Sequence, residues 1–413
     1  MAIRIIKSAD TVAVDALLSP RRDDETATRK AVAAIVESVR AEGDEAVAWF
    51  ARKFDGLDGP SEIPREEWTR GALQAPHDVR RAIAAAARNI ARVARAQLPR
   101  PFRLRVAPGV TVEQRVRPLD RVGCYVPGGR YPLPSSLLMT AIPARVAGVA
   151  EIIAVCPRPE PVVLAAAVAA GVTRLFQLGG AHAIAALALG TQTIPRVDRI
   201  VGPGNKYVAA AKTYVSAECG IDMQAGPSEI LVLSDRGNPV WLAADLIAQA
   251  EHDPDARAIL ITSKARLATA VAHEVVRQMP ATGPAREALA RHGGVIVTRT
   301  PAEAVSLANR MAPEHLVVDD EKTAAAVGRA GAIFIGQHTA QVAGDYAIGS
   351  NHVLPTGGAA RFRGGLHAAD YVRVVSVQRV TRAGLKTLGP TVRALALAEG
   401  LDAHAQSMIV RGV

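Results

Sequence analysis

Several short stretches of the sequence carry side chains that could bind a metal ion or transfer protons. Gln249 and His252 stand three positions apart at the end of an expected helix, so an amide oxygen and an imidazole would share one face. Glu314 and His315 lie where an expected helix leads into a strand, and a neutral imidazole accepts protons near neutral pH. Each pair also has an ordinary interpretation, as surface or structural side chains beside a helix end.

Two further stretches combine such side chains with glycine. The loop 344–358 carries Asp345 and His352, and glycine-rich loops of this length usually have a function. Near the C-terminus, Glu399 and His404 lie on either side of a glycine, where a helix cap is the simpler explanation.

These residues can be grouped by the chemistry of their side chains. Two imidazoles, a carboxylate and an amide oxygen form a donor set that suits zinc or another borderline divalent ion. The set is Gln249, His252, Asp345 and His404. Glu314 and His315 remain for proton transfer, and the lack of a cysteine ligand favours an open, catalytic metal site. Spacing does not establish the grouping, because the set runs from position 249 to position 404.

Three glycine-containing stretches could place backbone N–H groups against a phosphate. They are Gly123–Gly129, Gly179-Gly180 and Gly202–Asn205. The second and third directly precede an expected helix, where converging N–H groups bind phosphates. None is a complete G-x-G-x-x-G motif, and each alone is also typical of an ordinary tight turn. Three such turns at the edge of one sheet favour a nucleotide-binding domain.

Hydrophobic periodicity predicts the elements that position these residues. From about residue 122, short apolar strands alternate with glycine turns and helices, which is typical of parallel βαβ units. The same texture occurs in two consecutive blocks. We therefore expect the α/β class, with two Rossmann-like doubly wound domains of similar texture and small helical arm domains at both ends.

The expected division of the chain follows these blocks. An N-terminal helical arm covers residues 1–21, and the first α/β domain is discontinuous, formed by 22–120 and 230–366. The second α/β domain, which carries the glycine turns, covers 121–229, and a C-terminal helical arm covers 367–413. Gln249, His252, Glu314, His315 and Asp345 would then all belong to the first α/β domain.

Composition argues against several classes of protein. The chain has 413 residues, 49% hydrophobic and 21% charged, which is enough for two or more domains with sizeable cores. Its three cysteines are far apart, which argues against a disulfide framework and favours a reducing compartment. We see no secretory signal and no apolar run of the roughly 18 residues that a membrane helix needs, so we expect a cytoplasmic protein.

Seven dispersed stretches resemble the histidinol dehydrogenase family. They are Gly123–Gly129 with Pro134-Ser135, Ile200–Tyr207, Ile221–Glu229, Gln249–Pro254, Ala312–Leu316, Asn351–Thr356 and Glu399–His404. The likeness extends from about residue 120 to 408, with weaker matches at Gly43-Asp44 and Lys53–Gly56. It implies zinc-dependent, four-electron oxidation of L-histidinol to L-histidine through the aldehyde, with two NAD molecules reduced per turnover, as the last step of histidine biosynthesis.

The resemblance also implies a role for each site residue. One Zn²⁺ per subunit would be bound by Gln249, His252, Asp345 and His404, and Glu314 and His315 would be the catalytic pair. The substrate site would comprise Ser228, His352 and Glu399 together with the metal ligands and His315. NAD would contact Tyr125, His182 and Asn205. The family forms an intertwined homodimer, so His404 and Glu399 would reach the active site of the other subunit.

Position 182 departs from the family pattern, which usually has glutamine there. A histidine can also donate a hydrogen bond to a ribose or phosphate, so we expect only a modest effect on NAD affinity.

Two alternatives remain open. A paralogous zinc- and NAD-dependent dehydrogenase would use another small polar alcohol, such as a sulfonated diol, although Ser228, Glu399 and the loop 351–358 have the histidinol-like form. A non-catalytic nucleotide-binding or nucleic-acid-binding protein would make Glu314 and His315 dispensable and would bind with steep salt dependence. The net charge of +10 is spread over the chain without a basic run interleaved with aromatics, so we expect neither nucleic-acid nor membrane binding.

Overall fold

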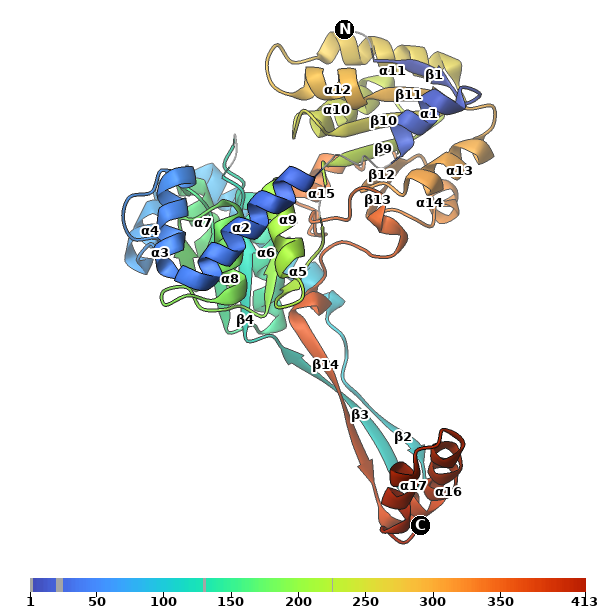
Figure 1. Ribbon diagram of the computed structural model, residues 1–413. Coiled ribbons are helices and arrows are strands. Elements are labelled where there is room, and N and C mark those ends of the chain that lie inside the picture. The colour runs from blue at the N-terminus through green and yellow to red at the C-terminus, as the bar shows by residue number, and fades with distance from the viewer. Residues whose placement is uncertain (1–2, 20–24, 129–130, 225) are drawn as a thin grey trace.

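The computed structural model describes residues 3–19, 25–128, 131–224 and 226–413. It contains two parallel sheets, here called sheet A and sheet B, and one antiparallel sheet, sheet C. Figure 1 shows two α/β bodies and a long arm that projects from them. The predicted α/β class is confirmed. Within the described ranges, no helix is long and apolar enough to cross a membrane.

Sheet B has five parallel strands in the order β6-β5-β4-β7-β8. The strands are β4 (Arg121–Tyr125), β5 (Glu151–Val155), β6 (Arg174–Phe176), β7 (Arg199–Val201) and β8 (Gly220–Ile221). Four helices connect them: α6 (Pro134–Ala147), α7 (Pro161–Ala170), α8 (Gly180–Leu189) and α9 (Lys206–Val215). The strand order reverses between β4 and β7, which is where doubly wound sheets bind ligands.

The helices that precede sheet B in sequence also cover it. They are α2 (Thr26–Glu42), α3 (Asp44–Phe50) with a π-helical turn η1 (Ala51–Asp55), α4 (Arg65–Ala72) and α5 (His77–Gln97). The first two pack with α8 and α9 on one face, and the last two with α6 and α7 on the other. The expected grouping of residues 22–120 with 230–366 is therefore wrong for these helices. Periodicity reveals their apolar faces, but both parallel sheets offer apolar surface to cover.

Sheet A has six parallel strands in the order β1-β11-β10-β9-β12-β13. They are β1 (Ile5–Lys7), β9 (Glu229–Leu233), β10 (Arg257–Thr262), β11 (Gly294–Val297), β12 (His315–Val318) and β13 (Ala332–Ile335). The helices are α1 (Thr11–Leu18), α10 (Pro239–Ala250), α11 (Ala265–Gln278), α12 (Ala285–His292), α13 (Pro301–Met311) and α14 (Glu321–Ala326). Without its edge strand β1, sheet A repeats the strand order of sheet B, as the two similar sequence blocks predicted.

The N-terminal segment is not a separate helical arm. Strand β1 pairs with β11 at the edge of sheet A, and α1 buries Val14, Leu17 and Leu18 against that sheet. The two consecutive apolar residues Ile5 and Ile6 are too few to distinguish a short strand from a helix by periodicity. Residues 1, 2, 20 and 21 of the expected arm lie outside the described residues.

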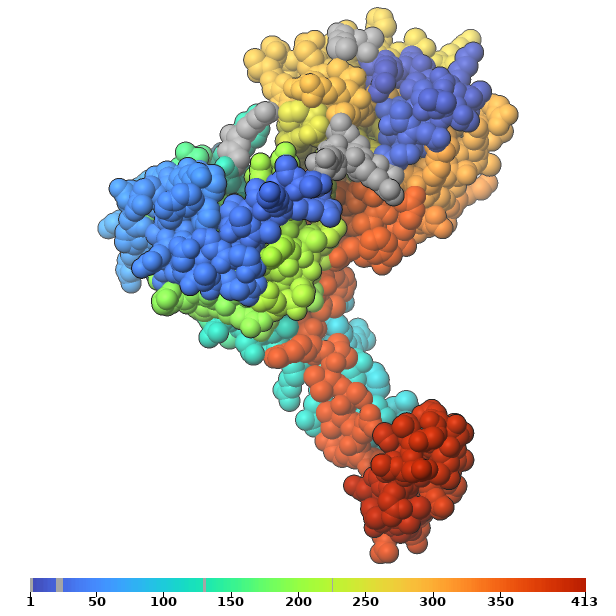
Figure 2. Space-filling model, viewed as in Figure 1, coloured from blue at the N-terminus to red at the C-terminus, as the bar shows by residue number. Residues whose placement is uncertain are grey.

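The projecting arm is built from sequence-distant pieces. Strands β2 (Phe102–Ala107), β3 (Val110–Pro118) and β14 (Val372–Val380) form sheet C, and α16 (Arg382–Ala398) and α17 (Asp402–Ile409) lie at its tip. Strands β2 and β3 pair antiparallel as a hairpin. The expected all-helical segment 367–413 is wrong at β14, where Val-Arg-Val-Val-Ser-Val-Gln-Arg-Val is rich in β-branched residues, which favour strands. The space-filling view shows how narrow the arm is beside the two bodies (Figure 2).

Candidate functional site

Sheet A brings the predicted proton-transfer pair together with Ser228. Strands β9 and β12 are neighbours, so the residues at their amino ends lie side by side. The Ser228 hydroxyl donates to Glu314 Oε2 at 2.6 Å, and the Glu229 N–H donates to the same oxygen at 2.8 Å. Burial raises the pKa of Glu314, and the charge of His315 and these hydrogen bonds counteract that effect only in part. Glu314 is therefore a buried, oriented carboxyl group that could act as a base.

His315 is held by one ring nitrogen. Its Nδ1 lies 3.1 Å from the carbonyl oxygen of Glu229, and because a carbonyl only accepts, Nδ1 carries the proton. Nε2 is buried and has no hydrogen-bond partner among the described residues; Asp345 Oδ1 lies 3.7 Å away. Burial disfavours the charged imidazole, but the carboxylates of Glu314 and Asp345 outweigh burial and raise the pKa of His315 to about 9.

Gln249 joins this cluster from α10. Its Nε2 donates to the Ser228 hydroxyl at 2.5 Å, and its buried Oε1 has no partner in the described part of the chain. The expected helix is present, and its N-cap is Asn238, which accepts from the Val240 N–H at 2.9 Å. The helix ends at Ala250, four residues before Pro254, so Gln249 and His252 do not share a helix face.

His252 lies beyond the end of α10. It is exposed, in a turn that Asp253 stabilises by accepting from the Asp255 N–H at 2.8 Å. Local hydrogen bonding by an aspartate thus ends the helix before the proline does. His252 is nevertheless close enough to His352 for its charge to affect the pKa of that group.

Asp345 and His352 come from the segment that follows sheet A. Asp345 lies on α15 (Gln341–Tyr346), where Gln341 Nε2 donates to its Oδ2 at 2.8 Å. The Asp345 carbonyl oxygen accepts from His352 Nδ1 at 2.9 Å. Burial favours the neutral acid, but His315, His352 and Gln341 outweigh it and lower the pKa of Asp345. Asp345 is thus an ionised group beside the free nitrogen of His315.

One chain does not bring the predicted metal ligands together. Among the described residues, no group of three or more His, Cys, Asp or Glu side chains could hold a metal ion. His404 on α17 and Glu399 at the end of α16 are exposed at the tip of the arm, away from α10 and α15 (Figure 1). The buried Oε1 of Gln249 has no partner among the described residues, so this oxygen fits the role of a cation ligand.

The turn Gly202–Asn205 connects β7 to α9 and is tightly constrained. Gly202 has φ of +116°, and a Cβ there would lie 2.2 Å from the carbonyl oxygen of Tyr125, so glycine is required. Asn205 is the N-cap of α9, because its Oδ1 accepts from the N–H groups of Tyr207 and Val208. Of the two polar groups of the Asn205 side chain, the amide nitrogen is therefore the one left to contact a cofactor.

Sequence reasoning missed a buried ion pair beneath this turn. Lys212 on α9 contacts Asp222 and donates to the Gly202 carbonyl oxygen at 2.9 Å. Asp222 Oδ2 in turn accepts from the Gly202 N–H at 2.7 Å. A lysine on the apolar face of a helix was the available signal, since lysine is almost never fully buried without a partner.

The turn before α8 uses His182 differently from the prediction. Tyr125 OH accepts from the Gly180 N–H at 3.0 Å, and Asp55 Oδ2 lies 3.0 Å from both the Gly179 nitrogen and His182 Nε2. The His182 ring is fully buried and stacks with Phe50 and Phe54. In this arrangement His182 supports the turn from inside, and direct contact with a dinucleotide would require the ring or its neighbours to move.

The stretch Gly123–Gly129 is only partly a turn. Residues 123–125 belong to β4, where an added Cβ at Gly123 would lie 2.9 Å from Leu187, so glycine there serves strand–helix packing. Gly129 lies outside the described residues, as does Ala225 in the stretch before Ser228.

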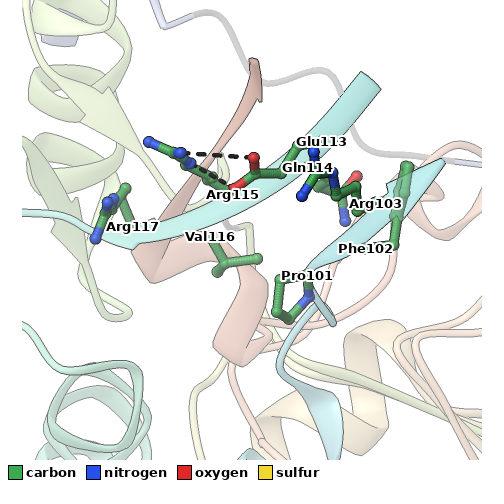
Figure 3. A pocket seen from close by; sticks show the side chains of 8 residues that line it. All are labelled: Pro101, Phe102, Arg103, Glu113, Gln114, Arg115, Val116 and Arg117. Carbon is green, nitrogen blue, oxygen red and sulfur yellow. Dashed lines mark hydrogen bonds and ion pairs between the residues drawn. The ribbon is translucent and has the colours of Figure 1, made fainter. Parts of the chain in front are cut away.

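A hollow of about 520 Å³ lies on the arm, away from these residues (Figure 3). Its lining comes from β2 and β3 and the residue before them: Pro101, Phe102, Arg103, Glu113, Gln114, Arg115, Val116 and Arg117. Arg115 Nε and Arg379 Nη1 lie 2.7 and 2.5 Å from the Glu113 carboxylate. None of these lining residues is a predicted site residue, and the Arg379–Glu113 ion pair joins β14 to β3.

Comparisons with known proteins identify the family of this chain. The family model described as histidinol dehydrogenase matches residues 18–412. A histidinol dehydrogenase of Rhizobium meliloti is 47% identical over 411 residues, covering 96% of this chain and 94% of that protein. One from Pseudomonas aeruginosa is 44% identical over 424 residues, covering 98% and 96%.

The fold comparison agrees as well. The crystal structure of histidinol dehydrogenase from Elizabethkingia anophelis superimposes with a TM-score of 0.93 at 32% identity, covering 99% of this chain and 98% of that one. On these matches over nearly its full length, the chain belongs to the histidinol dehydrogenase family and is an oxidoreductase.

Proposed function

We propose that this enzyme oxidises L-histidinol to L-histidine through the aldehyde, in histidine biosynthesis, and reduces two NAD molecules per turnover. The observation that carries the proposal is the His315 ring. Its Nδ1 is fixed by the Glu229 carbonyl, and its Nε2 lies beside Asp345 without a hydrogen-bond partner among the described residues. Because the pKa of His315 is raised to about 9, the ring acts as the base in its neutral form, after Nε2 has released its proton. The choice of L-histidinol as the substrate rests on the family to which the chain belongs.

The proposed steps use this pair in turn. His315 Nε2 accepts the hydroxyl proton of the alcohol while the carbon-bound hydride leaves for the first NAD. Glu314 then removes a proton from water as the water adds to the aldehyde, and protonated His315 gives its proton to the former aldehyde oxygen, which completes the hydrate and makes His315 neutral again. The resulting hydrate loses its hydride to a second NAD, with His315 again accepting the hydroxyl proton. Ser228 and the Glu229 N–H hold Glu314 in place for the water step.

We further propose one Zn²⁺ per subunit, bound by Gln249, His252 and Asp345 of one chain and His404 of the partner subunit. When bound, the ion would orient the substrate and supply positive charge near the reacting oxygen. Support comes from the donor set itself and from the unpartnered Oε1 of Gln249. Glu399 of the partner subunit would pair with the substrate's amino group, and His352 would contact the substrate from this chain.

A homodimer follows from the same reasoning. The arm exposes apolar side chains that a partner would cover, including Phe102, Leu104, Val106, Val374 and Val375. Exposed apolar residues grouped on a narrow projection are typical of an intersubunit contact.

NAD is proposed to bind sheet B at the turn Gly202–Asn205, near Tyr125. Support comes from the helix start and from the position of the turn at the strand-order reversal. The buried His182 would act on NAD affinity through the turn it supports.

The decisive experiment counts NADH per molecule of L-histidinol and identifies the product. Two NADH and histidine are expected, and zinc analysis should give one ion per subunit whose removal abolishes turnover and whose return restores it. A yield of one NADH would contradict the second oxidation, and full activity of metal-free enzyme would contradict the zinc proposal. A panel of other small polar alcohols, including a sulfonated diol, tests the paralogous activity, which predicts faster turnover of one of those compounds.

A further inference from the structure

Glu229 contacts both members of the catalytic pair. Its N–H donates to Glu314 Oε2 at 2.8 Å, and its carbonyl oxygen accepts from His315 Nδ1 at 3.1 Å. Its side-chain Oε1 accepts from the Glu314 N–H at 3.3 Å, and the Gly357 N–H also bonds to this carboxylate. The side chain is fully buried, with 1% of the residue exposed. One residue thus joins the start of β9, the start of β12 and the loop after His352.

Arg257 is the charged partner of Glu229. The two residues are paired in register on β10 and β9, with Arg257 Nε 3.6 Å from Glu229 Oε2. The guanidinium also donates to the carbonyl oxygens of Ser19 at 3.0 Å and Leu18 at 3.2 Å. Arg257 is 6% exposed, so the pair lies within the protein, where leaving either charge unpartnered is costly.

We propose that Glu229 and Arg257 are positioning residues that fix the orientation of Glu314 and His315. Arg257 holds the Glu229 side chain, the Glu229 side chain holds the backbone of Glu314 and Gly357, and the Glu229 backbone holds both reacting side chains. Neither residue touches the reacting atoms. As far as turnover is concerned, the inference rests on the proposed function.

The backbone groups of Glu229 are present in every variant, so substitutions test the side-chain contacts that hold this backbone and that of Glu314 in place. Glu229→Ala removes the acceptor for Glu314 and Gly357, whereas Glu229→Gln keeps one acceptor oxygen. Burial raises the pKa of the Glu229 carboxyl to about 7 in spite of Arg257, so a neutral amide is a suitable conservative replacement. Arg257→Met removes the charge that holds the carboxylate, and Arg257→Lys retains it.

The variants should lower kcat and leave cofactor binding unchanged. Glu229→Ala and Arg257→Met should lower kcat for histidinol by about 10- to 100-fold, the loss expected when catalytic groups shift by about 1 Å. Glu229→Gln and Arg257→Lys should lower kcat less, by about 3- to 10-fold at most, which is half of that loss on a logarithmic scale. KM for NAD should stay within about twofold, because the proposed NAD turn belongs to sheet B.

A double substitution tests whether Glu229 acts through the catalytic pair. Combined with His315→Asn, Glu229→Ala should cost less than about threefold more, because residues that act as a unit are non-additive. If the loss in the double variant equalled the product of the losses in the two single variants, the proposal would be overturned. A Glu229→Ala enzyme with wild-type kcat would also overturn it.

A matched control lies at the carboxyl ends of the same strands, opposite the amino ends that carry the cluster. Asp235 follows β9 and accepts hydrogen bonds from Thr262 and Ser263, and it contacts no predicted site residue. Asp235→Asn should lower thermal stability without lowering kcat, which separates positioning from general destabilisation.

A crystal structure of Glu229→Ala gives a readout that does not depend on the substrate. Glu314 should have turned so that its carboxylate no longer accepts from Ser228. Unchanged Glu314 geometry would overturn the positioning role even if another alcohol proved to be the substrate. Lack of histidinol oxidation by the wild-type enzyme, with Glu314 displaced in the variant, would instead contradict only the proposed function.

Discussion

At the scale of single residues, His315 illustrates how a fold selects one reactive atom. The Glu229 carbonyl fixes the tautomer, and the ring's other nitrogen has no hydrogen-bond partner among the described residues. His315→Asn should lower kcat by about 10²- to 10⁴-fold, the usual contribution of a general base, while zinc content stays at the wild-type value. Steady-state rates and metal analysis check this, and a rate within a few-fold of wild type would rule out His315 as the base.

Residue type and sequence position predicted Glu314 and His315 as a proton-transfer pair. The structure buries both side chains, and their catalytic role stays a prediction. Glu229, Arg257 and Lys212 were not predicted, because their function depends on partners that are distant in sequence. His182 was predicted to touch the cofactor, but its burial depends on the packing of α3 and η1, which no local pattern reveals.

At the scale of elements, the carboxyl end of β9 is joined to that of β10 by Asp235. Burial favours the neutral acid, but hydrogen bonds from Ser263 and Thr262 outweigh it and lower the pKa of Asp235. Because the folded pKa lies below the unfolded value of about 3.9, the stabilisation is present above about pH 4 and lost as pH falls through the folded value.

Asp235→Asn should therefore reduce the free energy of unfolding by about 1–2 kcal/mol at pH 7. The difference from wild type should shrink as the pH falls below 4, because protonation removes the same charge from the wild-type protein. Urea unfolding at pH 7, 5 and 3.5 measures this. An equal difference at all three values would show that the charge of Asp235 contributes nothing.

The turn between β7 and α9 depends on one glycine. An added Cβ at Gly202 would lie 2.2 Å from the Tyr125 carbonyl oxygen at φ of +116°, so the turn cannot keep its shape. Gly202→Ala should raise KM for NAD at least about tenfold, because the backbone N–H groups of the turn would move. Initial-rate kinetics with NAD varied at saturating histidinol measure this.

The control for this substitution is Gly364→Ala, where an added Cβ meets no atom within 4 Å. Its KM for NAD should match the wild type. If Gly202→Ala also left KM unchanged, NAD would have to bind away from this turn.

Element prediction failed where a segment's partner had to be known. The strand β14 lies in a segment expected to be helical, and its pairing partner β3 is more than 250 positions earlier in the chain. The apolar faces of helices α2–α5 follow helical periodicity, but nothing in them distinguishes sheet A from sheet B. Local periodicity encodes the element, whereas the choice between two similar sheets depends on shape complementarity across the whole molecule.

At the scale of the whole molecule, the arm separates His404 and Glu399 from the site that they are predicted to complete (Figure 1). The arm would bring them into the partner's active site only in an intertwined dimer. Each proposed site then combines the body of one chain with the arm of the other. This division makes a complementation experiment possible, because a body variant and an arm variant are defective in different parts of the site.

Mixing His315→Asn chains with His404→Asn chains should restore activity that neither variant has alone. In a mixed dimer, one site pairs the intact body of the His404→Asn chain with the intact arm of the His315→Asn chain. Random exchange makes half the dimers mixed, with one intact site of two, so recovery should approach about a quarter of wild-type activity. Mixing His315→Asn with Glu314→Gln should restore nothing, since both changes affect the body. If native mass spectrometry showed mixed dimers without recovery, His404 would have to act within its own chain.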